Sequence, residues 1–251
     1  MKAKKSLGQN FLKSEAALRK IIEAGNLTIK DTVLEIGPGK GALTKRLLQS
    51  AGKVIAVEKD DELTIFLQEK FEEYTKNHKL LLKNEDILDF QIPETITYKV
   101  IANIPYNITG SILKKFLTAT NQPEKMVLMV QLEVAKRIVA TDHKESILSI
   151  SVKVYGNPKI VMRVPSRYFS PAPKVDSAVI VIENISRKFF EENKIDEVKF
   201  WELIKTGFSH KRKRLSGNLK KFFPDKKSLP AKLGDKRAED LTLSDWILLA
   251  K

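Results

Sequence analysis

The chain has 251 residues, no cysteine, and a formal net charge of +14, from 45 Lys and Arg residues against 31 Asp and Glu residues. Its length suits one large domain with a small one, its charge favours nucleic acid or an anionic membrane surface as partner, and the absence of cysteine excludes disulfides and thiolate catalysis. No apolar run approaches the roughly 18 residues of a spanning helix and no signal peptide is recognisable, so we expect a cytoplasmic, monomeric protein without a structural metal.

The N-terminal run SLGQNFL (residues 6–12) joins small and polar residues to an apolar end. Such termini are often poorly ordered, but Phe11 and Leu12 are apolar enough to hold this one against a core. Ser14 can then cap a helix that Gly25 closes.

A glycine-rich turn follows the first apolar strand. Residues 33–36 lead directly into Gly37-Pro38-Gly39-Lys40-Gly41, and residues 42–48 continue with a helical pattern. Glycines let the backbone approach a ligand, and a helix N-terminus offers free N–H groups and a positive dipole end. The order strand, turn, helix therefore predicts a nucleotide or cofactor cradle, although glycines also serve plain loops.

Two carboxylates follow the next two strands. Glu58 ends a strand at residues 54–57, about 20 residues after the first glycine, where a carboxylate can accept both hydroxyls of a ribose. Asp86 follows a third strand at 80–82 and can accept from an adenine amine. The alternatives are a solvated surface charge for Glu58 and a turn or cap residue for Asp86.

The run Asn103-Ile104-Pro105-Tyr106 comes after a short strand at residues 100–102 and before a helical pattern. In open α/β sheets, ligands bind at the carboxyl ends of the strands. Asn103 offers a carbonyl acceptor, Ile104 a backbone carbonyl beside a fixed proline, and Tyr106 a flat face. Such a set can hold a planar group that bears an exocyclic amine, while an ordinary strand-to-helix turn is the alternative.

The remainder of this part is expected to contain strands at 126–130, 160–164 and 177–183 and helices around 133–137 and at 147–155, the last on a pattern that also fits a strand. A proline-rich loop before the last strand places Phe169 beside Ser170 and Pro171.

After Asn184 the charge rises and helical patterns follow at residues 200–208, 215–223 and 243–249. We therefore expect two domains, residues 1–184 and 185–251. A basic cluster, which starts the second of these helices, is either a solvated face or a phosphate-contacting surface. Its residues are Lys211, Arg212, Lys213, Arg214, Lys220 and Lys221.

Taken together in this order, the motifs resemble those of the ribosomal RNA adenine N6-dimethyltransferases, specifically their small-subunit branch. The resemblance is carried across nearly the whole chain by SLGQNFL, EIGPGKGALT, VEKD, EDILDF, NIPYNITG, VQLEVAKRI, FSPAPKVDSAV and FSHKRKRLSGNLK. The chain departs from relatives slightly, with Ile and Thr-Gly in NIPYNITG where Leu and Ser-Thr are frequent, and with a compact small domain.

The resemblance implies a Rossmann-like α/β domain of the class I methyltransferase type, with a mostly parallel sheet, followed by a small helical domain. It also implies S-adenosyl-L-methionine as cofactor and N6,N6-dimethylation of two neighbouring adenosines near the 3′ end of small-subunit ribosomal RNA. The small ribosomal subunit would be the partner.

The family's residue roles transfer to matching positions of this chain. Asn103 would border both the cofactor and the target base, with Ile104 accepting a second hydrogen bond, Pro105 shaping the turn and Tyr106 stacking on the base. Phe169 would offer the base a second face. The cofactor would be held by Asn10, Leu12, Gly37, Gly39, Glu58 and Asp86.

Three other interpretations stay open. The same chemistry on large-subunit RNA is the nearest one, but SPAPKVDSAV and KRKRLSGNLK favour the small-subunit branch. A non-catalytic ribosome assembly factor would not need the intact Asn103 motif, Glu58 and Gly37. A nicotinamide-dependent oxidoreductase explains the glycine turn but not the Asn103 motif or the charge.

Overall fold

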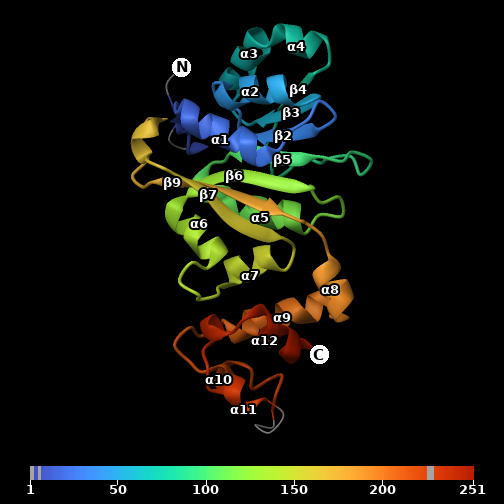
Figure 1. Ribbon diagram of the computed structural model, residues 1–251, viewed down its shortest axis with the longest axis vertical. Coiled ribbons are helices and arrows are strands. Elements are labelled where there is room, and N and C mark those ends of the chain that lie inside the picture. Colours follow the sequence, from blue (N-terminus) through green and yellow to red (C-terminus); the bar gives the residue numbers. More distant parts are fainter. Residues whose placement is uncertain (1–2, 5–6, 225–228) are drawn as a thin grey trace. The chain divides into compact units, whose positions relative to one another are not determined.

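The computed structural model describes residues 3–4, 7–224 and 229–251, so Ser6 of the expected N-terminal motif lies outside the described residues. By its internal contacts the chain divides into two compact units (Figure 1). The first contains Met1–Ala135 and Asn157–Ile185, and the second Lys136–Gly156 and Ser186–Lys251. Within the described residues, no helix has both the length and the apolar character that crossing a membrane requires.

The first unit is built on a seven-stranded sheet. In spatial order its strands are β4 (Leu80–Asn84), β3 (Lys53–Glu58), β2 (Thr32–Ile36), β5 (Lys99–Asn103), β6 (Lys125–Gln131), β9 (Ser177–Glu183) and β7 (Asn157–Val164). All neighbouring pairs are parallel except those made by β9, which runs antiparallel to β6 and β7. The predicted mostly parallel α/β fold is confirmed.

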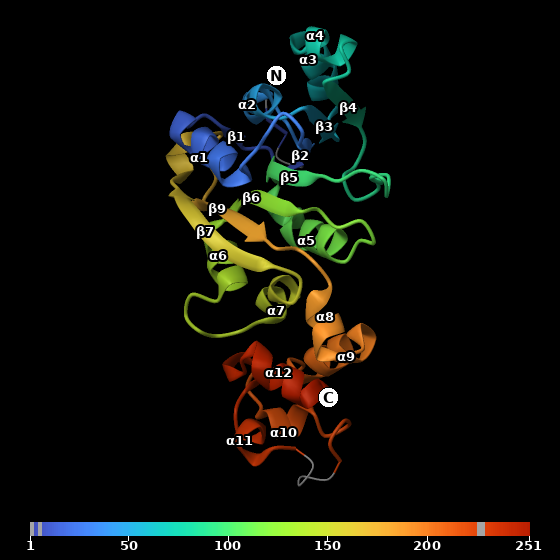
Figure 2. The same ribbon diagram turned by 45° about the vertical axis from the view of Figure 1, so that its right-hand side comes forward.

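Helices cover both faces of this sheet, which is why its central strands are mostly apolar rather than alternating. Buried side chains of α1 (Glu15–Gly25), α2 (Ala42–Ser50) and α3 (Asp61–Lys70) form one core cluster with one face of the sheet, and α4 (Glu72–Lys76) follows α3. The buried face of α5 (Thr109–Leu117) lies outside this cluster. Figure 2 shows α1 and α5 on opposite sides of the sheet, and α6 (Leu132–Val139) follows β6.

The strands β2 and β5 separate near their carboxyl ends. Their pairing ends at Leu34↔Val100, whereas β2 stays paired with β3 as far as Ile36 and β5 stays paired with β6 as far as Asn103. The chain order also reverses here, because β3 and β4 lie beyond β2 while β6 lies beyond β5. This is the switch point at which open α/β sheets bind ligands.

The second unit is helical among its described residues. Its helices are α7 (Ile147–Lys153), α8 (Lys188–Asn193), α9 (Glu197–Gly207), α10 (Leu215–Asn218), α11 (Ala231–Gly234) and α12 (Leu243–Ala250). Residues 147–153 are therefore helical, as the preferred interpretation predicted.

The predicted helix at 215–223 is wrong in its extent, because α10 ends at Asn218. Beyond it, the backbone N–H groups of Phe222 and Phe223 both donate to the Leu219 carbonyl in a tight turn. Pro224 follows, and a proline cannot continue a helix and disfavours helical geometry in the residue before it.

The contacts group residues 136–156 with the C-terminal segment, whereas the expected boundary at 184 left them in the larger domain. The Tyr155 ring lies against Phe190, with centroids 5.6 Å apart, and its hydroxyl donates to Glu197. Lys144 forms an ion pair with Glu239 at 3.0 Å. These partners are distant in sequence, so no local pattern could have shown the grouping. The assignment of catalysis to the first unit and RNA binding to the second stays a prediction.

Helix α1 shows how packing selects a residue. Ser14 caps it as predicted, accepting from the Ala17 N–H at 3.3 Å. Gly25 is its last residue, but the left-handed residue that ends it is Asn26, at φ 45°. Gly25 instead allows close packing, since a Cβ there would lie 2.6 Å from Cδ1 of Ile101 in β5.

We therefore expect Gly25→Ala to destabilise the protein by about 1–3 kcal/mol through overpacking. As a matched control, Gly110→Ala in α5 adds a Cβ with nothing within 4 Å and should stabilise by up to about 1 kcal/mol. Urea denaturation of the two variants measures both effects. Equal stability of the two variants would contradict the close approach of α1 to β5.

Candidate active site

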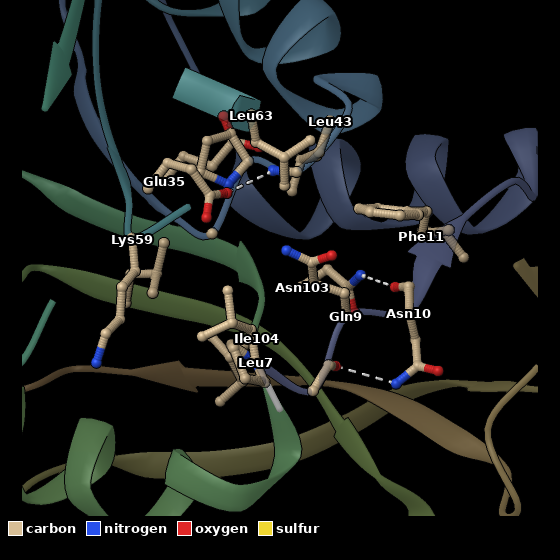
Figure 3. A pocket seen from close by; sticks show the side chains of 18 of the residues that line it. Leu7, Gln9, Asn10, Phe11, Glu35, Leu43, Lys59, Leu63, Asn103 and Ile104 are labelled. Atoms are coloured by element: carbon tan, nitrogen blue, oxygen red, sulfur yellow. Dashed lines mark hydrogen bonds between the residues drawn. The ribbon is translucent and has the colours of Figure 1, made fainter. Parts of the chain in front are cut away.

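A cavity of about 510 Å³ lies in the first unit at the carboxyl edge of the sheet. Its walls come from the N-terminal segment, the turn after β2, the ends of β3 and β4, and the turn after β5. Figure 3 labels residues from several of these walls, with Asn10 to the right of Asn103 and with Glu35 and Lys59 to its left. The residues predicted for catalysis and cofactor binding line it, except Phe169.

The turn after β2 brings backbone close to the cavity. Gly37 has φ 63° and donates its N–H to the Val57 carbonyl at 2.9 Å, which ties the turn to β3. Gly39 has φ 58°, and a Cβ there would lie 3.0 Å from the Phe11 ring. The turn therefore needs glycine for its conformation and for the closeness of the N-terminal segment.

The Glu58 carboxylate is held in a fixed orientation. Its Oε2 accepts from the Gly39 N–H and its Oε1 from the Asp60 N–H, each at 3.0 Å. Burial raises the pKa of this carboxyl, and the two backbone donors act against that rise. Each oxygen keeps a lone pair, so Glu58 can still accept two hydroxyl donors from a ligand.

Asp86 lines the cavity as predicted, but it also has protein partners. Lys59 Nζ lies 2.8 Å from its Oδ2, and its Oδ1 accepts from the Leu88 N–H at 2.9 Å. The ion pair with Lys59 holds the pKa of Asp86 below its ordinary value. The group is thus an ionised acceptor, and each of its oxygens keeps a lone pair for a ligand donor.

The turn after β5 places an amide and an aromatic ring at the same edge. Asn103 Nδ2 donates to the Asn10 carbonyl at 3.2 Å, a bond drawn in Figure 3. This bond orients the amide, whose acceptor for a ligand is Oδ1. Pro105 directs the chain into a short 3₁₀ turn at Tyr106–Ile108, and Thr109 braces the turn by donating to the Tyr106 carbonyl at 3.1 Å.

Ser177 is a site residue that the sequence analysis missed. Its hydroxyl, in a fully buried residue, lies 2.5 Å from the Tyr106 hydroxyl. Ser177 begins β9, and because β9 is antiparallel, its first residue lies at the edge where the other strands end. Burial raises the pKa of Tyr106, with the Ser177 hydrogen bond acting against it, so Tyr106 offers a neutral ring to the cavity.

Phe169 is not brought to this site. It is 3% exposed, belongs to the core cluster of the first unit, and does not line the cavity. Strand β8 (Phe169–Ser170) pairs with β1 (Phe11–Leu12), with Leu12 opposite Phe169, and this pairing holds the ring in the core. Its neighbour Ser170 lines the cavity instead.

Glu35 is a second missed residue. It lies in β2 at 1% exposure and lines the cavity, and its Oε2 has no hydrogen-bond partner among the described residues. Burial raises its pKa to about 8. A charged residue inside the apolar run VLEI was the available signal, because an unpaired buried carboxyl is costly unless a ligand uses it.

The six basic residues predicted to bind RNA are all exposed in the second unit. As predicted, Lys211, Arg212 and Lys213 directly precede a helix, because Arg214 is the N-cap of α10, while Lys220 and Lys221 lie in the turn after it. Asn218 holds the turn before α10 by donating to the carbonyls of Gly207 and His210. Arg214 pairs with Asp235 and Lys221 with Glu202. The other four make no ion pair with any described residue.

Known structures resemble this fold over nearly its whole length. A dimethyladenosine transferase from Plasmodium falciparum is 27% identical with a TM-score of 0.80, covering 95% of each chain. The 23S rRNA methyltransferase ErmE is 25% identical with a TM-score of 0.79, covering 96% of this chain and 98% of its own. Fold and site together thus define an α/β methyltransferase.

Sequence comparison identifies the family within this class. A model of the ribosomal RNA adenine dimethylases matches residues 1–251, and the chain belongs to that family. A protein of Dehalococcoides mccartyi (strain CBDB1) named ribosomal RNA small subunit methyltransferase A is 43% identical, over 98% of this chain and 87% of the relative. A Fusobacterium nucleatum protein of the same name is 38% identical over 100% and 97%. The predicted enzyme class is confirmed.

Proposed function

We propose that this protein uses S-adenosyl-L-methionine to dimethylate N6 of two adjacent adenosines near the 3′ end of small-subunit ribosomal RNA, in the cytoplasm and late in subunit assembly. The observation that carries the proposal is the Asn103–Tyr106 turn. It lies at the edge where β2 and β5 part, with its amide oriented by Asn10 and its aromatic ring by Ser177.

The cavity suits a cofactor of this chemistry. S-adenosylmethionine supplies a methyl group on a positively charged sulfur and also carries an ammonium group. Glu35 offers a buried oxygen without a partner among the described residues, which a cationic ligand can satisfy. Glu58 would bind the ribose hydroxyls, and Asp86 would accept from the adenine amine. Gly37 and Gly39 would let the backbone come close to the methionine end of the cofactor, and Asn10 and Leu12 would contact the cofactor from the N-terminal segment.

The proposed role of Asn103 follows from the chemistry of adenine. The exocyclic amine is a weak nucleophile because its lone pair is delocalised into the ring. Asn103 Oδ1 and the Ile104 carbonyl would accept its two N–H groups, orient the lone pair, and stabilise the positive charge that develops on nitrogen. Tyr106 would stack on the base after it leaves the RNA stack. No strong general base is needed, since the proton is lost readily after transfer.

The choice of small-subunit RNA rests on the relatives and not on the fold. The Plasmodium transferase and the 23S rRNA enzyme have nearly equal TM-scores, 0.80 and 0.79, so the backbone does not separate substrates. The relatives at 43% and 38% identity are both named as small-subunit enzymes. The second unit would add phosphate attraction that does not depend on sequence.

The decisive experiment transfers labelled methyl groups to unmethylated small subunits, with large subunits alongside. Wild-type protein should label small subunits alone, as N6,N6-dimethyladenosine. Asn103→Ala should lower kcat by roughly 10²-fold or more, with little change in RNA affinity, because one orienting acceptor is lost. Asn77→Ala, an exposed asparagine after α4, is the control. Tight subunit binding without any label would make the protein an assembly factor.

Glu35 generates a prediction about pH. With a pKa of about 8, its carboxyl is largely protonated at about pH 6.5, and a cationic ligand favours the ionised form. Cofactor binding should therefore release a proton, and affinity should rise by up to about tenfold per pH unit between roughly pH 5.5 and 7.5. Calorimetry in buffers of different ionisation enthalpy measures the proton count.

Glu35→Gln should abolish most of this proton release. Glu85→Gln, which removes a carboxyl from an exposed residue of the same cavity, should retain it. The same proton count in wild-type protein and Glu35→Gln would show that another group meets the cationic ligand.

The basic cluster predicts a salt effect. Two double variants remove equal charge: Lys211→Gln with Arg212→Gln, which lack ion pairs among the described residues, and Arg214→Gln with Lys221→Gln, which have them. The first pair should flatten the dependence of RNA affinity on salt by roughly 0.7–0.9 in log–log slope for each phosphate that the variant no longer neutralises, and the second pair should flatten it less. Unchanged slopes in both would move the RNA-binding surface elsewhere.

A further inference from the structure

The N-terminal residues 7–13, here called the strap, form a wall of the cavity that lies outside the seven-stranded sheet. The strap contacts the rest of the first unit at several places. Phe11 and Leu12 pair with β8, the Asn10 carbonyl accepts from Asn103, and Lys40 Nζ lies 4.9 Å from the centre of the Phe11 ring. Figure 3 shows Leu7, Gln9, Asn10 and Phe11 around the cavity. These contacts hold the middle and the C-terminal end of the strap.

The N-terminal end of the strap is held by Asp60. Asp60 Oδ2 accepts from Gln9 Nε2 at 2.7 Å, and Oδ1 lies 2.8 Å from Lys4 Nζ. Gln9 also accepts the Lys4 backbone N–H through its Oε1 at 2.7 Å. One carboxylate therefore binds two strap-side donors, which are themselves linked.

Asp60 does not line the cavity, so its influence on a ligand must pass through other residues. Its side chain is 2% exposed, and its backbone N–H donates to the Glu58 carboxylate. Burial opposes its ionisation, but the hydrogen bonds from Lys4 and Gln9 hold the pKa of Asp60 below its ordinary value. It is thus a buried anion between the predicted ribose acceptor and the strap.

We propose that Asp60 is a positioning residue that fastens the strap over the cofactor cavity and thereby couples strap closure to cofactor binding. The inference rests on the proposed function for the identity of the cofactor. Cofactor binding would stabilise the closed strap because the strap residues line the cavity. Asp60 would stabilise the same conformation through its bonds to Gln9 and Lys4, outside the cavity. Two events that favour one conformation reinforce each other.

Asp60 has a second, purely structural role that a test must separate. It is the N-cap of α3, where its Oδ1 accepts from the Glu62 N–H at 3.1 Å. Asn is about as good an N-cap as Asp, so Asp60→Asn keeps the cap. With Oδ1 kept for the cap and for Lys4, the variant places its NH₂ group at the position of Oδ2, where it faces Gln9 Nε2, so that two donors oppose each other.

The experiment measures two quantities in the full chain: binding of S-adenosylhomocysteine by calorimetry, and hydrogen exchange of residues 7–13 and 61–70 by mass spectrometry. Asp60→Asn should weaken binding by about tenfold, within the usual range of coupling between sites. It should speed exchange in residues 7–13 and leave residues 61–70 unchanged.

Asp61→Asn is the matched control, since it removes the same charge from the first turn of α3 at an exposed residue that makes no ion pair with any described residue. It should leave binding and strap exchange at wild-type values. Lys4→Met leaves the α3 cap intact and should act in the direction of Asp60→Asn with a smaller effect, so the proposal stays testable if Asp60→Asn does not fold.

Wild-type affinity in both Asp60→Asn and Lys4→Met would overturn the proposal, as would faster exchange confined to α3. Failure of the proposed function is distinguishable: wild-type protein would then methylate no ribosomal RNA, while Asp60→Asn would still loosen the strap and weaken binding of S-adenosylhomocysteine. Conversely, normal methylation by wild-type protein with an unaffected Asp60→Asn would remove only the role of Asp60.

Discussion

The separation of β2 from β5 is the feature that makes room for the site. Two parallel strands that remained paired to their ends would satisfy each other's backbone groups and leave no space between them. Here the pairing stops at Leu34↔Val100, while the outer neighbours hold β2 and β5 in place for their full length. The sheet therefore opens at one edge while each strand stays paired on its outer side, and the turns that follow the two strands face a common cavity.

The walls of that cavity hold one another in position. Asn10 orients the Asn103 amide, Gly39 donates to Glu58 and allows Phe11 to approach, and Ser177 orients Tyr106. Each contact joins segments that are far apart in the chain. A site of this kind is preorganised, since little reorientation of its groups is needed when charge develops during methyl transfer.

Buried carboxyl groups and the exposed basic cluster lie in different units. Two carboxyl groups of the cavity, those of Glu35 and Glu58, are buried and suit a cationic ligand with hydroxyl groups. The exposed basic cluster of the second unit suits the phosphates of RNA. The net charge of +14 therefore reflects residues that suit RNA phosphates rather than residues of the cavity.

The strands, most helices and the residues at the strand ends could be predicted from the amino-acid sequence, because apolar runs, glycine turns and caps are local signals. The family could be predicted as well, since eight motifs in order are far more specific than any one of them. The contacts of Ser177 and Asp60, the absence of a hydrogen-bond partner for Glu35 Oε2 among the described residues, the burial of Phe169 in the core and the grouping of residues 136–156 with the C-terminal segment were visible only in the three-dimensional structure. These features depend on hydrogen bonds and burial between residues that are distant in the sequence. Ser177 is an example: because β9 runs antiparallel, the first residue of this strand lies at the ligand-binding edge, whereas the sequence analysis considered only residues that follow strands.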